Sequence, residues 1–363
     1  MLGPAANDIW ASTFHSACVR ILRRDIEKLG FSSSFTIYDT DDSLRVVKDC
    51  LKDLNIDEKQ FPPRSVLGYI SRAKDAMKLA EEYLADCERA GDFRLTKIAK
   101  VYVEYQRRLW EASALDFDDI ILHTVRLLQQ HEDVRAFYQR KFRYVLIDEY
   151  QDTNNLQYLL ASTLAGGYEN FCVVGDDDQS IYRFRGATIE NILSFEHQYQ
   201  GARVIRLEQN YRSTKNILEA SNAVIRNNQG RKGKELWTRA GEGEKLHLYT
   251  AMNESDEAQY VAARILEDYS QGIPWKDHAV LYRMNAQSNQ LEQAFKRNGI
   301  PYRIIGGIRF FDRAEVKDMI AYLAVLNNPE DDLRLTRIIN NPPRGIGAKT
   351  VETAQEVARR CGA

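Results

Sequence analysis

The spacing of hydrophobic and polar positions changes several times along this 363-residue chain. Between residues 17 and 114, apolar residues recur at intervals of three and four, which predicts amphipathic helices. From residue 115 to about residue 305, short apolar runs alternate with helical patterns. Because that alternation is typical of βαβ units, it predicts parallel sheets flanked by helices, and therefore an α/β fold. After Phe311 the pattern is helical again.

Short apolar runs rich in β-branched residues mark the predicted strands. Val145–Ile147 is such a run, and we expect it to be a buried strand of a parallel sheet. The other predicted strands are residues 171–175, 203–207, 245–249, 279–282 and 302–305. Helices are predicted to begin at about residue 155 and to cover residues 188–199, 254–270 and 286–298.

Two carboxylates, Asp148 and Glu149, stand where the central predicted strand ends. In open α/β sheets the ligand crevice lies at the carboxyl ends of the strands. One acid there can hold Mg²⁺ through a water, and a second can orient and deprotonate an attacking water, as in a Walker B motif. The alternative is that Asp148 only caps the helix that follows.

A second group of candidate functional residues lies in the loop 175–187. With the preceding valine, the sequence of residues 174–187 is V-G-D-D-D-Q-S-I-Y-R-F-R-G-A. Gln179 is a candidate to sense a terminal phosphate or its attacking water. Tyr182 and Phe184, with arginines such as Arg185 interleaved, are suited to stack bases and hold a strand backbone. The alternative is an acidic turn before a core helix.

Two further candidates stand after predicted strands or between predicted helices. Tyr211 and Arg212 follow the strand at 203–207, where an aromatic ring can stack on a purine and a guanidinium can reach phosphate oxygens as an arginine finger. Gly345 and Gly347, in R-G-I-G, fit either a helix-hairpin-helix that offers backbone N–H groups to a duplex phosphate or a plain helix end and turn. The basic stretch 226–239 is interpreted as a solvated loop, with phosphate contact as the alternative.

Composition narrows the class of protein without deciding its function. The length predicts two or more domains, and 44% hydrophobic residues fit a globular chain with an ample core. Fifty Lys and Arg against 52 Asp and Glu neither favour nor exclude nucleic acid. The five scattered cysteines lack metal-ligand spacing, which favours reduced thiols in the cytoplasm. No apolar run approaches the roughly 18 residues that span a bilayer, so no membrane contact is expected.

Taken together, the motifs resemble those of UvrD/PcrA/Rep-type superfamily 1 DNA helicases, closest to the PcrA branch. They are T-F-H-S, L-D-F-D-D, L-I-D-E-Y-Q-D-T-N, V-G-D-D-D-Q-S-I-Y-R-F-R-G-A and L-E-Q-N-Y-R-S, in that family's order. The resemblance covers essentially the whole chain and implies RecA-like P-loop NTPase lobes with inserted all-helical subdomains. It implies a lobe segment at 1–16, a helical insertion at 17–114, lobe 1 at 115–209, part of lobe 2 at 210–313 and the start of a second insertion at 314–363.

The resemblance also implies roles for the matching residues. Asp148 would hold Mg²⁺, Glu149 would be the catalytic base, Gln179 and Arg212 would contact the γ-phosphate of ATP, and Tyr211 would stack on adenine. The single-stranded DNA path would be lined by Thr13, Phe14, His15, Tyr182, Phe184 and Arg185. Phe184 stands where many relatives carry Trp, which preserves an aromatic face for stacking.

One departure from the family concerns the phosphate cradle. The P-loop sequence G-x-x-x-x-G-K-[ST] is absent from these 363 residues, and the G-A-K-T at 347–350 has an alanine between glycine and lysine. In the family the P-loop precedes T-F-H-S and the last motifs follow the R-G-I-G region. We therefore expect an internal fragment, truncated at both ends and inactive by itself.

The resemblance implies that the parent protein is an ATP-dependent 3′→5′ DNA helicase. It would couple Mg·ATP hydrolysis to movement along single-stranded DNA and to unwinding at single/double-strand junctions, as in DNA repair and replication. The alternatives are the helicase part of an AddA/RecB-like helicase-nuclease and a DNA-binding protein that does not hydrolyse ATP. The second has no use for the retained catalytic residue types. The sequence indicates no protein partner.

Overall fold

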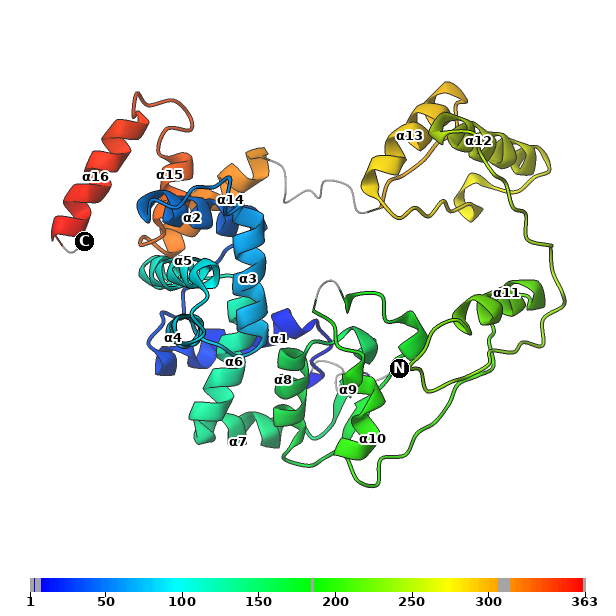
Figure 1. The fold of residues 1–363 in the computed structure, drawn as a ribbon, viewed down its shortest axis with the longest axis horizontal. Helices are drawn as coiled ribbons and strands as arrows, with labels where there is room; N and C mark the ends of the chain where they lie inside the picture. Colours follow the sequence, from blue (N-terminus) through cyan, green and yellow to red (C-terminus); the bar gives the residue numbers. More distant parts are fainter. Residues whose placement is uncertain (1–2, 4–7, 184–185, 306–313, 362–363) are drawn as a thin grey trace. The chain divides into compact units, whose positions relative to one another are not determined.

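The structure is a computed structural model that describes residues 3, 8–183, 186–305 and 314–361 (Figure 1). The chain divides into two compact units, which are described separately. Unit one comprises Met1–Arg206, Asn228–Gly233 and Ala314–Ala363, and unit two comprises Leu207–Asn227 and Lys234–Arg313.

The first part of unit one is helical, as the apolar spacing predicted. Its elements are α1 (Phe14–Asp25), η2 (Ile26–Leu29), β1 (Thr36–Ile37), α2 (Thr40–Asp53), α3 (Pro63–Asp75), α4 (Ala80–Arg89), α5 (Phe93–Glu111), β2 (Ala114–Leu115), α6 (Phe117–Gln130) and α7 (Glu132–Lys141). At the start of several of these helices, a polar side chain accepts a hydrogen bond from a free backbone N–H group of the first turn. This capping fixes where the helix begins. Thr13 does so for α1, Asp39 for α2, Asp92 for α5 and Asp116 for α6.

Two separate hydrophobic cores hold these helices together. In the first, Cys18 and Leu22 of α1 pack with Val125 and Leu128 of α6. Leu160 of α8 (Asn155–Ala165) completes the same core. Burying each large side chain contributes about 1.5–3 kcal/mol.

The second core lies among the helices α2, α3 and α5. It contains Val47 and Leu51 of α2, Ile70 of α3, and Tyr102 and Tyr105 of α5. The two cores meet where the short parallel strands β1 and β2 pair, with Thr36 opposite Ala114.

The strand that carries the predicted Walker B residues is present, but it is not buried. β3 (Val145–Ile147) pairs in parallel with β4 (Phe171–Val173), Val145 lying opposite Phe171, and α8 connects them. Leu146 is nevertheless 69% exposed. A parallel strand is buried when strands flank it on both edges and helices cover both faces. In the described part of the chain, β4 is the one strand that pairs with β3, so the prediction of a buried central strand was wrong.

The remaining elements of unit one come from distant parts of the sequence. They are η3 (Tyr150–Asp152), η4 (Asp177–Gln179), α9 (Glu190–Leu193), α10 (Phe195–Gln198), α14 (Ala314–Asn327), α15 (Asp332–Ile338) and α16 (Ala348–Cys361). The segment with α14 and α15 packs beside α2 (Figure 1). There the Tyr38 hydroxyl donates to Asp331 Oδ1 at 2.7 Å, and Asn328 Nδ2 donates to the Ala112 carbonyl at 2.8 Å.

Unit two is built around a pair of packed helices. It contains α11 (Lys215–Ile225), α12 (Glu254–Ser270), η6 (Trp275–Asp277), η7 (Asn285–Gln287) and α13 (Ser288–Arg297). Ala258 and Ala262 of α12 pack with Phe295 of α13 and with Ile300. The bounds of α12 match the predicted helix 254–270 residue for residue.

Four predicted strands do not form. The structure assigns no strand to residues 203–207, 245–249, 279–282 or 302–305, all of which it describes. A strand requires a neighbour that completes its hydrogen bonds, and among the described residues no strand pairs with these segments; Leu248, Leu281 and Ile305 are exposed. The apolar runs that suggested these strands are present, but the described structure gives them no neighbouring strand with which to pair.

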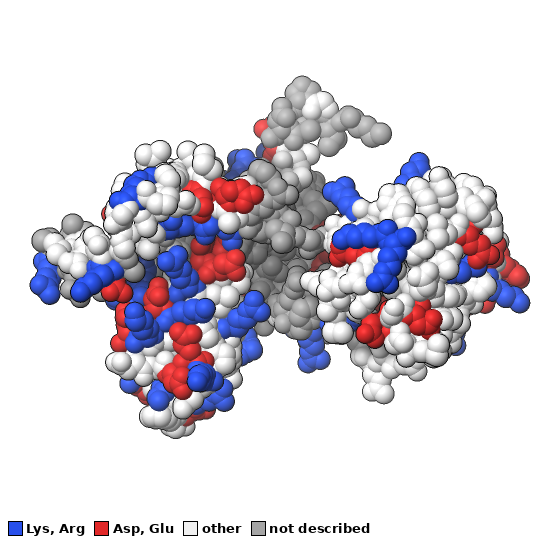
Figure 2. Space-filling model, turned by 90° about the horizontal axis from the view of Figure 1, so that it is seen from above, with Lys and Arg blue, Asp and Glu red and all other residues white. Residues whose placement is uncertain are grey.

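None of the helices among the described residues is both long enough and apolar enough to cross a membrane. Figure 2 shows that lysine and arginine are interspersed with aspartate and glutamate on the face displayed, in keeping with the formal net charge of −2.

Candidate nucleotide site and DNA-facing loops

The two predicted Walker B carboxylates lie directly after β3 in a sharp turn. Glu149 has a φ of +52°, in the left-handed region that non-glycine residues rarely adopt. Asp148 Oδ1 accepts a 3.0 Å hydrogen bond from the Glu149 N–H, and both side chains are exposed. The next α-helix, α8, is capped by Asn154, which accepts from the Gln157 N–H at 2.8 Å. Asp148 is therefore not the cap of that helix, and its side chain is exposed at the strand end.

A buried amide, Gln151, joins Glu149 to the next loop. Gln151 Nε2 donates to Glu149 Oε2 at 2.8 Å, and Gln151 Oε1 accepts from the Asp176 N–H at 2.9 Å. The Gln151 side chain is only 1% exposed. An amide can donate and accept at once, so it can hold two loops in one geometry. Sequence reasoning gave Gln151 no role, although it stands two residues after Glu149 in a motif that was singled out.

Gly175 is required by the same contact. A Cβ at position 175 would lie 2.6 Å from Gln151 Oε1 and 2.8 Å from Ile192 Cδ1, both too close. Glycine at this position therefore leaves room for another group to approach the backbone closely. In the structure the group that approaches is the Gln151 amide.

Gln179 lies at the far end of this hydrogen-bonded chain. Its backbone N–H donates to the Asp176 carbonyl at 2.9 Å, and its Nε2 donates to Asp176 Oδ2 at 2.7 Å. Glu149, Gln151, Asp176 and Gln179 thus form one connected series. The structure therefore brings together two of the predicted catalytic residues, Glu149 and Gln179, through two residues that were not predicted.

The acidic turn of this loop is the second place where a cation would be stabilised. One carboxylate oxygen of each of Asp176, Asp177 and Asp178 lies within 4.8 Å of the others. Asp178 is already paired with Arg231, whose Nε and Nη2 each lie 2.6 Å from a carboxylate oxygen. The positive charge at this turn is therefore supplied by a side chain, and Asp148 remains the candidate Mg²⁺ ligand.

The predicted DNA-contacting residues occupy two separate elements. Tyr182 is part of the loop after Gln179 and is 38% exposed, whereas Phe184 and Arg185 lie outside the described residues. Thr13 accepts from the Ser16 N–H at the start of α1, and the His15 ring packs edge-on against Phe117 at 5.6 Å. Phe14 is half-buried against the first core.

Burial decides the charge of His15. It lowers the pKa of the imidazole below its ordinary value, so the ring is neutral at pH 7. A neutral imidazole can stack on a base of a DNA strand or form a hydrogen bond with it, but it cannot form an ion pair with a phosphate.

Tyr211 and Arg212 belong to unit two, unlike Glu149 and Gln179. Tyr211 is 85% exposed, which leaves its ring available for stacking. The turn is held by Asn210, whose Oδ1 accepts from the Arg212 and Ser213 N–H groups at 2.9 and 2.8 Å. In place of the predicted strand there is a single bridge between Gln209 and Trp237.

The R-G-I-G turn connects α15 and α16. Gly345 has a φ of +75°, in the left-handed region that glycine adopts without steric cost. The side chain of Asn340 accepts the backbone N–H groups of Arg344 at 2.7 Å and of Ile346 at 3.3 Å. A phosphate at this turn would therefore depend on the N–H groups of Gly345 and Gly347, the two residues that were predicted.

Comparison with known proteins gives matches to both parts of the chain. Residues 1–200 match the UvrD/REP helicase N-terminal domain, and residues 205–362 match the UvrD-like helicase C-terminal domain. The chain is 52% identical over 353 residues to the ATP-dependent DNA helicase PcrA of Bacillus subtilis, covering 97% of this chain and 47% of that protein. It is 50% identical over 358 residues to PcrA of Staphylococcus epidermidis, covering 99% of this chain and 49% of that protein. It is 50% identical over 359 residues to PcrA of Staphylococcus aureus, with the same two shares. The chain thus spans about half the length of the curated relatives that it matches.

Proposed function

Because the chain belongs to the UvrD/Rep helicase family, we propose that it carries part of the motor of an ATP-dependent 3′→5′ DNA helicase. The motor would couple ATP hydrolysis to movement along single-stranded DNA and to duplex unwinding. The observation that supports this most directly is the hydrogen-bonded series from Glu149 through Gln151 and Asp176 to Gln179. It joins the proposed catalytic base to the proposed phosphate sensor.

Glu149 is suited to act as the base. A carboxylate has two oxygens, and Gln151 donates to Oε2 of Glu149 only, at 2.8 Å. Oε1 is left to accept a proton from an attacking water, while the hydrogen bond to Oε2 fixes the orientation of the group. The exposed carboxylate of Asp148 is a hard oxygen ligand of the kind that Mg²⁺ prefers, and it would hold the ion through a water. The ion would neutralise charge on the phosphates of bound ATP.

We assign Tyr211 to stacking on adenine and Arg212 to the γ-phosphate. The exposure of the Tyr211 ring supports the first assignment, and the ordered turn around Asn210 supports the second. The 363 residues contain no P-loop sequence, so the phosphate cradle is not assigned to any residue of this chain.

We assign the single-stranded DNA path to Thr13, Phe14, His15, Tyr182, Phe184 and Arg185. Tyr182 lies three residues after Gln179 in one loop, which gives DNA a short covalent route to the phosphate sensor. Gly345 and Gly347 are assigned to the duplex side of a single/double-strand junction.

The finer architecture is part of the same proposal. Residues 1–16 and 115–209 would belong to one RecA-like lobe and 210–313 to a second, with helical insertions at 17–114 and 314–363. A role in DNA repair and replication and a cytoplasmic location would fit this activity. Cys18, Cys50, Cys87 and Cys172 are free thiols, in keeping with a reducing compartment.

The proposal is tested with the complete gene product. We expect phosphate release from ATP to rise strongly when single-stranded DNA is added. We also expect separation of a duplex that carries a 3′ single-stranded tail, with little separation of one that carries a 5′ tail. A protein that bound DNA but released no phosphate would instead be a DNA-binding protein without a motor.

A further inference from the structure

Residues 228–233 pack in a different unit from the residues on either side of them in the sequence. This segment belongs to unit one, whereas the stretches on both sides of it, 207–227 and 234–313, belong to unit two. The sequence had suggested that the basic stretch 226–239 is a solvated loop. For Arg231 and Lys232 that interpretation was wrong, because both residues bind acidic side chains of unit one.

The contact of Arg231 is specific to an arginine. Its Nε and Nη2 donate to the two carboxylate oxygens of Asp178, each at 2.6 Å, and the two side chains are only 16% and 13% exposed. This paired geometry uses the planar fork of the guanidinium, which a lysine cannot reproduce. Next to it, the backbone N–H of Lys232 donates to Asp177 Oδ2 at 2.7 Å, and Lys232 Nζ donates to Glu196 Oε2 at 2.6 Å.

The residue that Arg231 holds stands directly before the proposed phosphate sensor. Asp178 precedes Gln179, and both lie in the short helix η4. The Asp178 N–H also donates to Asp176 Oδ1 at 2.9 Å, and Asp176 Oδ2 accepts from Gln179 Nε2. Three carboxylates within 4.8 Å of one another repel, so this turn is stable only when cations or donors compensate the charge. Arg231 supplies one such cation.

We infer that Arg231 is a positioning residue for ATP hydrolysis, which fixes Gln179 through its paired contact with Asp178. The inference rests on the proposed function. Arg231 touches no reacting atom in this assignment, and its effect on catalysis passes through Asp178.

The first test measures steady-state kinetics of the complete gene product. Arg231→Ala and Asp178→Ala are each expected to lower the DNA-stimulated kcat about tenfold, because misplacing a catalytic group by about 1 Å can cost up to about 10²-fold. The KM for ATP should change less than about twofold. Arg231→Lys should be intermediate, and the double alanine variant should be no slower than either single one. The exchanged pair, Arg231→Asp with Asp178→Arg, should recover part of the rate. The matched control is Arg226→Ala, which removes an exposed arginine from the same basic stretch.

The second test needs no activity. Hydrogen–deuterium exchange of the 363-residue chain reports how firmly residues 176–183 are held. Arg231→Ala should exchange faster there than the wild type, and Arg226→Ala should not. Exchange and kcat that match the Arg226→Ala control would overturn the inference, as would single effects that multiply in the double variant. Faster exchange in a complete protein that has no DNA-stimulated ATPase would refute the proposed function and the catalytic role of Arg231, while leaving the ion pair as a structural contact.

Discussion

The ammonium of Lys74 donates to Asp116 Oδ2 at 2.6 Å, and both side chains are buried. Lys74 lies near the end of α3, and Asp116 caps α6, so the pair joins the helical segment to the helix that begins L-D-F-D-D. Asp119 lies 2.8 Å from the same ammonium, and the Tyr105 hydroxyl donates to Asp116 at 2.8 Å. Burial alone would lower the pKa of Lys74, but the charges of Asp116 and Asp119 raise it above its ordinary value. Lys74 is therefore a cation in the folded protein.

Replacing Lys74 should destabilise the fold strongly. Lys74→Met leaves two buried carboxylates without their cation, and breaking a buried pair in this way costs about 3–5 kcal/mol of unfolding free energy. Adding Asp116→Asn should recover part of the loss, because less uncompensated charge remains. Urea unfolding of the 363-residue chain measures both changes.

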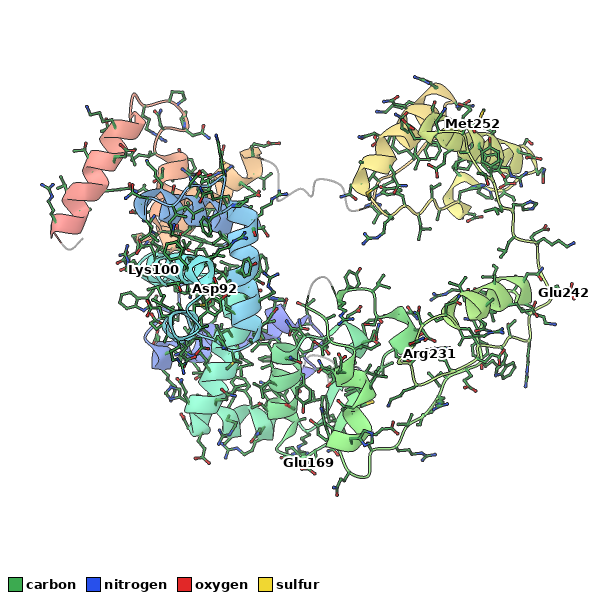
Figure 3. The ribbon with its side chains drawn as sticks, in the orientation of Figure 1. Asp92, Lys100, Glu169, Arg231, Glu242 and Met252 are labelled. Atoms are coloured by element: carbon green, nitrogen blue, oxygen red, sulfur yellow. The ribbon has the colours of Figure 1, made fainter. Side chains whose placement is uncertain are left out.

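The control for this prediction is Lys100→Met, which removes an exposed lysine of α5 (Figure 3). Its effect should stay within about 0.5 kcal/mol. A loss below about 1 kcal/mol for Lys74→Met would show that the buried carboxylates are satisfied without it.

Asp75 predicts a dependence of stability on pH. Burial, with a smaller contribution from the charge of Asp118, raises the pKa of Asp75 to about 7 from its ordinary value of 3.8. The folded protein then keeps a proton that the unfolded chain releases, so this group's stabilisation is complete below about pH 4 and is lost as the pH rises through about 7. Asp75→Asn retains an oxygen that can accept from Asn154 Nδ2, as Asp75 does at 2.8 Å, but it has no charge to bury.

The melting temperature of Asp75→Asn relative to that of the wild type should accordingly be higher at pH 8.5 than at pH 5. Glu58→Gln, which removes an exposed carboxylate, is the control. An equal difference for Asp75→Asn at both pH values would mean that Asp75 is already ionised at pH 5.

Gln151 should affect the rate of ATP hydrolysis. Gln151→Glu keeps the size of the side chain and can still accept from the Asp176 N–H, but it places a second carboxylate against Glu149. The repulsion between the two carboxylates should displace Glu149, and we expect the kcat of the complete gene product to fall at least about tenfold. Gln157→Glu introduces the same charge at the start of α8, where a glutamate preserves the capping box, and should leave kcat unchanged. Equal kcat values for the two variants would show that Gln151 does not position Glu149 for catalysis.

The isolated 363-residue chain should release no phosphate from ATP, with or without single-stranded DNA. Its sequence has Asp148, Glu149 and Gln179 but no P-loop to anchor the phosphates on which they act. Phosphate release clearly above that of a Glu149→Gln control would contradict this expectation.

Local patterns predicted the helices and the order of the candidate residues, but not the contacts between distant segments. The bounds of α12 and the start of α8 followed from the spacing of apolar residues, which is local. The exposure of Leu146 depends on how many strands flank β3, which the apolar run itself does not contain.

The bridge of Gln151 and the ion pair of Arg231 were missed for a similar reason. Gln151 reaches Asp176 across 25 residues, and Arg231 reaches Asp178 across 53. Neither pair leaves a periodic signal in the sequence. The residue types alone allowed Gln151 to be a surface amide and Arg231 to be a solvated cation.

The central claim is that Glu149 is the base of a DNA-dependent ATPase that drives 3′→5′ unwinding. The most direct measurement compares the complete gene product with its Glu149→Gln variant for phosphate release and for separation of a 3′-tailed duplex. The amide can still accept the hydrogen bond from Gln151, but it cannot take a proton from water, so ATP binding should persist. Both rates should fall by at least about 10²–10⁴-fold. Unwinding by Glu149→Gln at a rate near that of the wild type would contradict the account.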